Sequence, residues 1–353
     1  MNPRVPWRIQ AFFYAVFQHA SSLLSRASVK KSTKPDISFF CNYQQTTGAT
    51  VAIACIANQL SRYFNVDAHI KPLSGYSKLL KLRVRQIFSP QQLSGDIVFV
   101  DIQRDSQSVS RLVSDNKTVI LTCHAFPTTL HSVPQDKLVT NLELSSYIHF
   151  VSEHQRSEFI QHYPAIDIQN KSFAIPNYTR KCTKSKHTGN VGIVGLLNRE
   201  PKNALKGIKL GQASNARTIE CWGSCNIHGL NNPEEFPKLR ISGWTYNTQK
   251  IFNSFDVLIS TSNSETFALV VAEALSAGIP CLLSDIPVYR ELYSDCEGVI
   301  LMTGDDVEDI ASIDHLLENA DSLKSNIVDF WGKHFSSKTI DKAWISKIRE
   351  INE

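Results

Sequence analysis

The feature that most constrains the fold of this chain is an alternation of short apolar runs with amphipathic segments from residue 36 onward. Apolar runs bounded by polar turns and separated by helical stretches are typical of βαβ units, whose strands form a parallel sheet. The first half of the chain contains, in order, DISFFCN, a predicted helix over about 49–63, VDAHI, DIVFVDI, KTVILTCH and YIHFVS. The sequence therefore predicts an α/β fold.

The alternation is interrupted once and then begins again. After FAIPNYTR, the stretch KCTKSKHTGN is polar and basic and has no periodicity, which predicts a linker over 179–190. The strand-like runs that follow are VGIVG, RTIECWG, LRISG, DVLIS, PCLLS and GVIL. A chain of 353 residues is long enough for two domains. We therefore predict two successive doubly wound domains, over 35–178 and 191–335.

The charge of the chain limits the classes of partner. A net charge of +4 and a pI near 8.5 suit a polyanionic substrate or an anionic membrane surface. Lysines and arginines are spread out, and no RNP, zinc-finger or helix-turn-helix pattern is present, so nucleic acid is not an expected partner. No apolar run reaches the ~18 residues that a membrane-spanning helix needs.

The cysteines favour a reducing compartment, which we expect to be the cytoplasm. Eight cysteines are scattered along the chain, and several of them lie inside apolar runs as small buried residues do. Cys221, Cys225 and His228 have a spacing that could supply three zinc ligands, but a fourth is missing. A strand followed by a turn is the favoured interpretation of this stretch.

Residues 1–34 form a basic segment whose apolar residues have helical spacing. These apolar residues are Ile9, Phe13, Val16, Phe17, Ala20 and Leu24. A signal peptide is disfavoured, because Gln18 and His19 interrupt the apolar core and no small-x-small cleavage pattern follows. Two alternatives stay open: a helix packed on its own protein, and an in-plane anchor on an anionic membrane surface.

The stretch STSNSETFALVVAEALSAGIPCLLSD, residues 260–285, places two carboxylates around an apolar run. Glu265 follows the predicted strand DVLIS, and a helix is expected to begin near Thr266, carry Glu273 and end at Gly278. The backbone amides at such a helix start can bind an anion. These are the amides of Phe267, Ala268 and Leu269. The pattern fits a nucleotide sugar, although on spacing alone two solvated glutamates are the favoured interpretation.

Residues 260–291 resemble the signature of glycosyltransferase family 4, a group of retaining nucleotide-sugar transferases with the GT-B fold. Its E-x7-E motif, small-residue Gly-Pro run and later Glu correspond to Glu265, Glu273, ALSAGIP and Glu291. Five further segments resemble the family in its order: TVILTCH, YIHFVSEHQRSEFIQHY, AIPNYT, VGIVGLLNREPKN and LRISGW. The resemblance implies two Rossmann-like domains facing a cleft, with a C-terminal helix over 336–353 that crosses back to the N-terminal domain.

The resemblance also implies roles for individual residues. Glu265 would hold the donor sugar, Glu273 the ribose hydroxyls, and Lys202 would neutralise the pyrophosphate; His124 would lie beside the anomeric carbon. His124, Lys202 and Glu265 are thus the expected catalytic residues. The expected substrate-binding residues are Gly48, Gly195, Arg199, Gly243, Trp244, Thr266, Phe267, Ala268, Leu269 and Glu273.

Several positions depart from the family pattern. Leu196 follows Gly195 where the family has an arginine, and we expect Arg199 to reach the same phosphate instead. Thr266 and Ala268 replace glycines of the family's E-G-F-G stretch. Gly48 alone remains of a glycine pair in the first loop. These changes bear on the identity of the donor more than on the fold.

The implied activity is retaining transfer of a sugar from a UDP- or GDP-linked donor to an acceptor hydroxyl, without a cofactor. No D-x-D motif that would bind a metal ends a predicted strand. The expected acceptor is a saccharide or lipid-linked saccharide in envelope polysaccharide, lipopolysaccharide or glycolipid assembly, at the cytoplasmic face of a membrane. The alternatives are a nucleotide-sugar-binding scaffold without turnover and a GT-B epimerase. A phosphorylase or dinucleotide oxidoreductase is less favoured, because neither a pyridoxal lysine nor G-x-G-x-x-G is identified.

Overall fold

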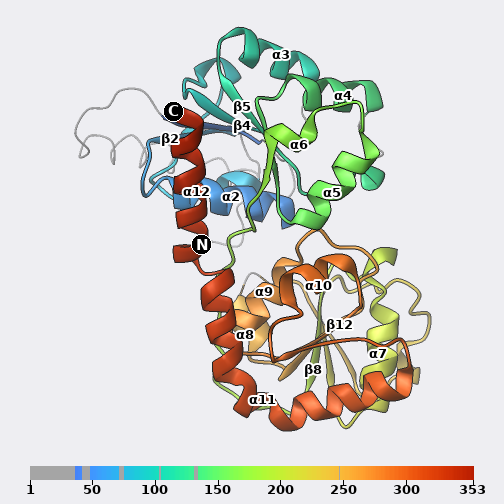
Figure 1. Ribbon diagram of the computed structural model, residues 1–353. Helices are drawn as coiled ribbons and strands as arrows, with labels where there is room; N and C mark the ends of the chain where they lie inside the picture. Colours follow the sequence, from blue (N-terminus) through green and yellow to red (C-terminus); the bar gives the residue numbers. More distant parts are fainter. Residues whose placement is uncertain (1–35, 42–47, 71–74, 103–104, 131–133, 246) are drawn as a thin grey trace, which may run out of the picture. The chain divides into compact units, whose positions relative to one another are not determined.

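The computed structural model describes residues 36–353, apart from 42–47, 71–74, 103–104, 131–133 and 246 (Figure 1). The described chain forms two compact units, one containing the residues up to Tyr178 together with Ile340–Glu353, the other Thr179–Thr339. Each unit is an α/β domain with a parallel sheet, which confirms the predicted fold class. The predicted basic segment 1–34 lies outside the described residues.

The first domain is built on a parallel sheet of seven described strands in the order β3-β2-β1-β4-β5-β6-β7. The strands are β1 (Ile37–Phe40), β2 (Val66–His69), β3 (Arg85–Ile87), β4 (Ile97–Asp101), β5 (Thr118–Thr122), β6 (Tyr147–Phe150) and β7 (Ser172–Ala174). Its helices are α2 (Gly48–Leu60), α3 (Ser106–Ser114), α4 (Gln135–Leu144), α5 (Glu153–His162), α6 (Ile168–Lys171) and the short η1 (Gly75–Leu79), η2 (Pro90–Gln92) and η3 (Pro127–Thr129).

Helices cover both faces of this sheet because successive strand residues point to opposite sides. Phe39 and Phe99 stack with ring centroids 4.6 Å apart in a core that includes residues of α2. Val98 and Val100, the neighbours of Phe99, belong to a second core with residues of α3, α4 and α5. Strands buried on both faces explain why the predicted runs are continuously apolar.

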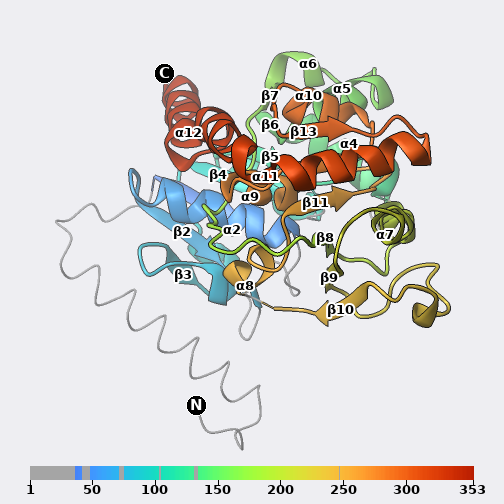
Figure 2. The ribbon, with the colours of Figure 1, turned by 90° about the horizontal axis from the view of Figure 1, so that it is seen from below.

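The last helix, α12 (Ser337–Asn352), packs on the first domain beside α2 (Figures 1 and 2). Trp344 is fully buried, and its ring lies 5.4 Å from that of Phe99 and 4.7 Å from that of His149. The Asp341 carboxylate accepts hydrogen bonds from the hydroxyls of Tyr63 at 2.8 Å and Tyr178 at 2.9 Å. The predicted return of the C-terminal helix is thus confirmed.

The second domain has a parallel sheet of six described strands in the order β10-β9-β8-β11-β12-β13 (Figure 2). The strands are β8 (Val191–Gly195), β9 (Ile219–Gly223), β10 (Leu239–Gly243), β11 (Val257–Ser260), β12 (Cys281–Leu283) and β13 (Val299–Leu301). The helices are α7 (Ala204–Ala213), α8 (Thr248–Phe252), α9 (Leu269–Ser276), α10 (Pro287–Tyr293), α11 (Asp306–His334) and the short η4 (Glu200–Lys202) and η5 (Pro233–Glu235).

Residues 179–190, predicted as a linker, have no helix or strand and are attached to the second domain. The fully buried Asp256 accepts the amide of Thr188 at 2.8 Å and forms an ion pair with Lys184. These contacts lower the pKa of Asp256, whereas burial acts in the opposite direction and is the largest single influence. No helix among the described residues is long and apolar enough to cross a membrane.

Replacement of Trp344 by alanine tests the role of α12 in the first domain. We expect Trp344→Ala to lower the free energy of unfolding by about 3–5 kcal/mol, the usual cost of deleting a buried aromatic side chain. Urea unfolding followed by circular dichroism measures the change. Trp244→Ala is the matched control, because the Trp244 side chain is 57% exposed. Equal unfolding midpoints for the two variants would show that α12 contributes little to the domain.

Candidate functional site

The strand order of the second sheet reverses between β8 and β11, which pair directly. From β8 the chain continues to β9 on one side, whereas from β11 it continues to β12 on the other. Open α/β sheets bind ligands outside the carboxyl ends of the strands at such a reversal. The loops that follow β8 and β11 are therefore the place to look for a site, and they contain most of the predicted residues.

The loop after β8 begins with a close backbone approach. A Cβ atom on Gly223 would lie 1.9 Å from the carbonyl oxygen of Gly195, so the ends of β8 and β9 can meet only with glycine at 223. The chain then passes the half-buried Leu196 and the exposed Arg199 into η4, which ends at Lys202. The Lys202 side chain folds back over Gly195, with Nζ 3.9 Å from the position that a Cβ would take there.

Lys202 and Glu265, two of the predicted catalytic residues, form an ion pair. Their side chains are 25% and 14% exposed, and Ser262 Oγ donates a second hydrogen bond to Glu265 Oε1 at 2.9 Å. Two contacts join the loops that carry them. Thr261 Oγ1 donates to the carbonyl of Asn203, and the amide of Asn263 donates to that of Pro201, both at 2.8 Å. The two charges are therefore held by the fold and not by their own attraction alone.

The helix after Glu265 begins later than its sequence predicts. We expected a start near Thr266, but α9 begins at Leu269 and its N-cap is Ala268. Ala268 has φ 60° and ψ 75°, a left-handed conformation that cannot continue a helix and costs about 1–2 kcal/mol for a residue with a Cβ. In the first turn of α9 the amide of Val271 donates to the Ala268 carbonyl at 3.0 Å, which leaves the amides of Leu269 and Val270 as those without an intrahelical acceptor. The predicted end holds, because Gly278 has φ 72° just after Ser276.

Glu273 lies one turn into α9 and has different surroundings from Glu265. Burial raises its pKa from 4.5 to about 7, and the positive charge of Arg180 acts in the opposite direction. Ser276 connects this part of α9 to residues 179–190, since its hydroxyl donates to the carbonyl of Arg180 at 3.1 Å and accepts the amide of Cys182 at 2.8 Å. A glutamate with a pKa near neutral pH can accept a hydrogen bond from a ligand hydroxyl when it is ionised and donate one when it is protonated.

The remaining predicted residues of this domain are exposed or lie at an edge. Gly243 ends the edge strand β10 with φ 73°, and the next residue, Trp244, is more than half exposed. The zinc alternative at Cys221, Cys225 and His228 is not supported, because among the described residues no group of three such side chains could hold a metal ion. Cys221 is buried within β9, whereas Cys225 is exposed.

In the first domain, His124 follows β5 at the carboxyl edge of the sheet. Burial and, to a smaller extent, the nearby His149, whose ring lies 6.4 Å away, together lower the pKa of His124 to about 3. The imidazole is therefore neutral at physiological pH. Gly48 is the exposed first residue of α2, and no described residue outside its own helix turn lies within 4 Å of a Cβ placed there.

Two tyrosines of α10 belong to the site and were not predicted. Tyr289 shares a 2.8 Å hydrogen bond with Ser260 Oγ, and Tyr293 donates one of 2.6 Å to the carbonyl of Phe267. Both are fully buried. Their i, i+4 spacing in PVYRELY, which places two hydroxyls on one helix face behind the Glu265 loop, is the signal that could have identified them. Ser262 and Arg180 were also missed, and no motif marks them.

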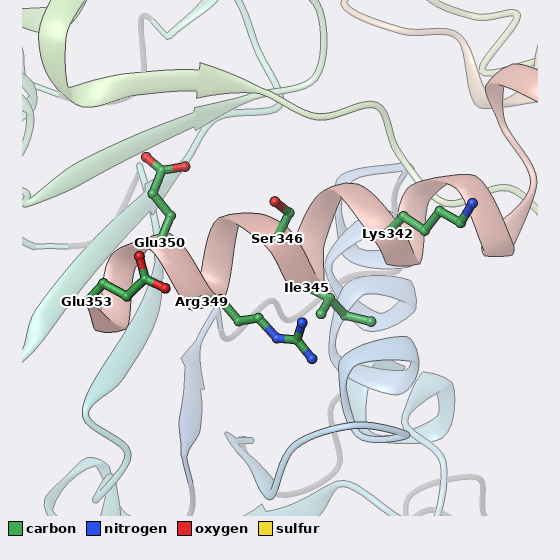
Figure 3. Close-up of a pocket in the computed structure, with 6 residues that line it drawn as sticks. All are labelled: Lys342, Ile345, Ser346, Arg349, Glu350 and Glu353. Carbon is green, nitrogen blue, oxygen red and sulfur yellow. The ribbon is translucent and has the colours of Figure 1, made fainter.

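A separate pocket of about 550 Å³ lies along α12 (Figure 3). Its lining residues are Lys342, Ile345, Ser346, Arg349, Glu350 and Glu353. The side chains carry charges of both signs on one helix, and none is a predicted site residue. We therefore place the candidate site at the β8 and β11 loops and not here.

Comparisons with known proteins agree with the fold. Residues 237–328 match the model of the family described as glycosyl transferases group 1, and no curated protein matches the chain. Anabaena Alr3699/HepE, solved with UDP, has 15% sequence identity and a TM-score of 0.71 over 89% of this chain and 100% of that one. Sucrose-phosphate synthase from Thermosynechococcus elongatus has 10% identity and a TM-score of 0.69 over 89% and 98%.

A third solved structure matches over a shorter range. The pneumococcal O-GlcNAc transferase GtfA, solved with UDP and GlcNAc, has 15% identity and a TM-score of 0.57 over 73% of this chain and 57% of that one. Identities this low show the fold alone. The family match over 237–328 contains both Glu265 and Glu273.

The raised pKa of Glu273 predicts a pH-dependent stability. Between about pH 4.5 and pH 7 the unfolded chain has lost this proton while the folded protein retains it, so the free energy of unfolding falls as the pH rises. Glu273→Gln has no carboxyl group here, so its free energy of unfolding does not fall for this reason. We expect the free energy of unfolding of this variant, relative to wild type, to rise by about 2–3 kcal/mol between pH 4.5 and pH 8. Urea unfolding at several pH values measures the difference.

The control is Glu234→Gln, which replaces an exposed glutamate of η5 in the same domain. Its free energy of unfolding is measured relative to wild type over the same range. If the difference for Glu273→Gln does not change with pH, Glu273 is already ionised in the folded protein at low pH.

Proposed function

We propose that this protein is a glycosyltransferase that moves a sugar from a nucleoside diphosphate sugar to an acceptor hydroxyl. The observation that carries the proposal is the ion pair between Lys202 and Glu265 at the strand-order reversal, adjacent to the start of α9. A cation, unpaired helix amides and a carboxylate in one place suit a ligand that joins a diphosphate to a sugar. The group 1 family match over 237–328 supports the same activity.

The donor is proposed to replace the Lys202–Glu265 pair with two contacts of its own. Lys202 and the first amides of α9 would bind the diphosphate, while Glu265 would accept hydrogen bonds from sugar hydroxyls. Glu273 would bind the ribose, and Gly243 and Trp244 would lie near the base. Because structures of Alr3699/HepE contain UDP, glucose or UDP-glucose, a UDP-linked donor is tested first and a GDP-linked donor second.

The chemistry proposed is transfer with retention at the anomeric carbon by a front-side, oxocarbenium-like route. The donor's bond to the diphosphate breaks as the acceptor oxygen approaches from the same face, and the acceptor proton passes to the leaving diphosphate. Lys202 and the α9 amides stabilise the charge that the diphosphate gains. His124, which is neutral at physiological pH, would form a hydrogen bond with the sugar. Neither a metal nor a cofactor is proposed, since Lys202 and the amides supply the charge stabilisation.

The acceptor is proposed to be a saccharide or lipid-linked saccharide of envelope polysaccharide, lipopolysaccharide or glycolipid assembly, at the cytoplasmic face of a membrane. The basic amphipathic segment 1–34 motivates this part of the proposal.

A second candidate function is nucleotide-sugar binding without turnover. Leu196 favours it, because the resemblance leads one to expect a cation at this position. A GT-B epimerase would turn over a nucleotide sugar without releasing the nucleotide.

Calorimetric binding of UDP, GDP, CMP and ADP, followed by mass spectrometry of sugar release from the matching nucleotide sugars, tests the activity. We expect one diphosphate to bind with micromolar affinity. Lys202→Ala is expected to lower turnover about 100-fold, because it removes a charge that stabilises the leaving group. Lys209→Ala, an exposed lysine of α7, is the charge-matched control and should retain wild-type turnover. Binding without sugar release or transfer would favour the scaffold, and no binding would contradict both functions.

Deletion of residues 1–34 tests the membrane part of the proposal. We expect the full chain to sediment with vesicles that contain anionic lipid and the shortened chain to remain in solution, because the six lysines and arginines of this segment contribute about 1 kcal/mol each near an anionic surface. Vesicles of neutral lipid and a circular dichroism spectrum of the shortened chain are the controls. Equal sedimentation of both chains would show that residues 1–34 do not anchor the protein to the membrane.

A further inference from the structure

We propose that Tyr293 is a positioning residue of the donor site, whose hydroxyl holds the Phe267–Ala268 turn so that the first amides of α9 face the donor's diphosphate. The inference rests on the proposed function, because it names what keeps the diphosphate-binding backbone in place. Tyr293 would touch no substrate. It would act through the backbone of the turn.

The turn needs an external support because Ala268 is in an unfavourable conformation. Among the residues that the structure describes, three that are not glycine have positive φ: Asn116, Asn203 and Ala268. Asparagine tolerates this region because its short polar side chain can hydrogen-bond locally, whereas alanine has no such compensation. A residue held in this way persists only where its surroundings fix it. The resembling family has glycine at this position, which adopts positive φ without a steric cost.

Tyr293 provides the support through both its hydroxyl and its ring. The hydroxyl donates to the Phe267 carbonyl at 2.6 Å and also lies 3.5 Å from the Ala268 carbonyl, so it contacts both peptide groups on either side of the strained residue. The Phe267 ring is buried and meets the rings of Tyr293 at 6.3 Å and Phe335 at 5.7 Å. The turn is therefore fixed by a hydrogen bond on its backbone and by packing of its side chain.

The preceding tyrosine of the same helix supports the other end of the loop. Tyr289 contacts Ser260 Oγ at 2.8 Å, and Ser262 donates to Glu265, the partner of Lys202. Helix α10 thus bears two hydroxyls, one at each end of the segment 260–268. Burial raises the pKa of Tyr289 and Tyr293 well above the usual value, so both remain protonated donors throughout the working pH range. The support is therefore insensitive to pH.

The test uses Tyr293→Phe, which removes one oxygen and keeps the ring in its packing. We expect the affinity for the bound nucleoside diphosphate to fall about tenfold, equivalent to about 1.4 kcal/mol, while the affinity for the corresponding nucleoside is unchanged. Hydrogen–deuterium exchange of a peptide covering 262–271 should become faster in the free protein. Tyr163→Phe, which removes a hydroxyl bonded to Gln135 at 3.0 Å in the first domain, is the matched control for both measurements.

A second substitution separates positioning from a general structural role. Because glycine adopts the left-handed conformation without cost, Ala268→Gly in the Tyr293→Phe background should restore the diphosphate affinity to within about threefold of wild type. If Tyr293 only stabilised the domain, the affinity of the folded protein for the diphosphate would not fall in Tyr293→Phe, and there would be no loss for glycine to restore.

The outcomes distinguish this inference from the proposed function. If wild type binds a diphosphate and Tyr293→Phe binds it equally well, or if glycine does not rescue the loss, the inference is overturned and the function stands. If wild type binds none of the diphosphates, the proposed function fails and the role of Tyr293 in donor binding fails with it. A change in exchange alone, with diphosphate affinity unchanged, also overturns the positioning role.

Discussion

The reversal of strand order between β8 and β11 is the constraint on which the candidate site depends. Two neighbouring parallel strands send their loops toward opposite sides, so the backbone does not fill the space beyond their carboxyl ends. Lys202 enters this region from the β8 side and Glu265 from the β11 side. The contacts from Thr261 and Asn263 to the η4 loop then fix the distance between the two loops. The chemistry of the site follows from the topology of the sheet.

The Lys202–Glu265 pair is suited to exchange partners with a ligand. Both side chains are partly exposed, and ion pairs at such positions contribute little net stability because solvent screens them. Opening the pair therefore costs little when each charge gains a partner on the ligand. The pair Lys184–Asp256 differs, because its fully buried carboxylate also accepts backbone amides and would be left unsatisfied. The Lys184–Asp256 pair thus fixes the segment 179–190, whereas the Lys202–Glu265 pair lies at the candidate site.

In the first sheet, the amino-acid sequence predicted the interior strands better than the edge strands. DIVFVDI and KTVILTCH contain β4 and β5, which lie within the sheet and are apolar on both faces. The strands β3 and β7 were not predicted, because each has three residues at a sheet edge and gains its structure from pairing with a neighbour. The predicted helix over 49–63 corresponds to α2, whose last residue is Leu60 because the chain turns directly after it.

The contact between Lys202 and Glu265 in the candidate site was not predicted. Lys202 and Glu265 are 63 positions apart, and no local pattern tells which strands are neighbours. The start of α9 was misplaced for a related reason: Thr266 is a good N-cap by type, but the hydroxyl of Tyr293 from another helix favours a left-handed residue at 268. The preference of Thr266 for an N-cap position was overridden by the contact of Tyr293 with the Phe267 carbonyl, which the sequence alone does not reveal.

Leu196 stands where the resembling family has an arginine, and this makes the Phe267–Ala268 turn more important for the proposed site. Leu196 is half-buried and uncharged, so the cation that the structure places beside Glu265 is Lys202. In the proposed donor complex, one positive side chain stands in place of two, so a larger share of the diphosphate charge would fall on the backbone amides at the start of α9, whose effect depends on their direction. Amides can be aimed only if the turn before them is fixed. This chain has Leu196 and Ala268 where the resembling family has an arginine and a glycine, so the proposed site depends more on support behind the turn. The two buried tyrosines of α10 contact both ends of the segment 260–268 and supply that support.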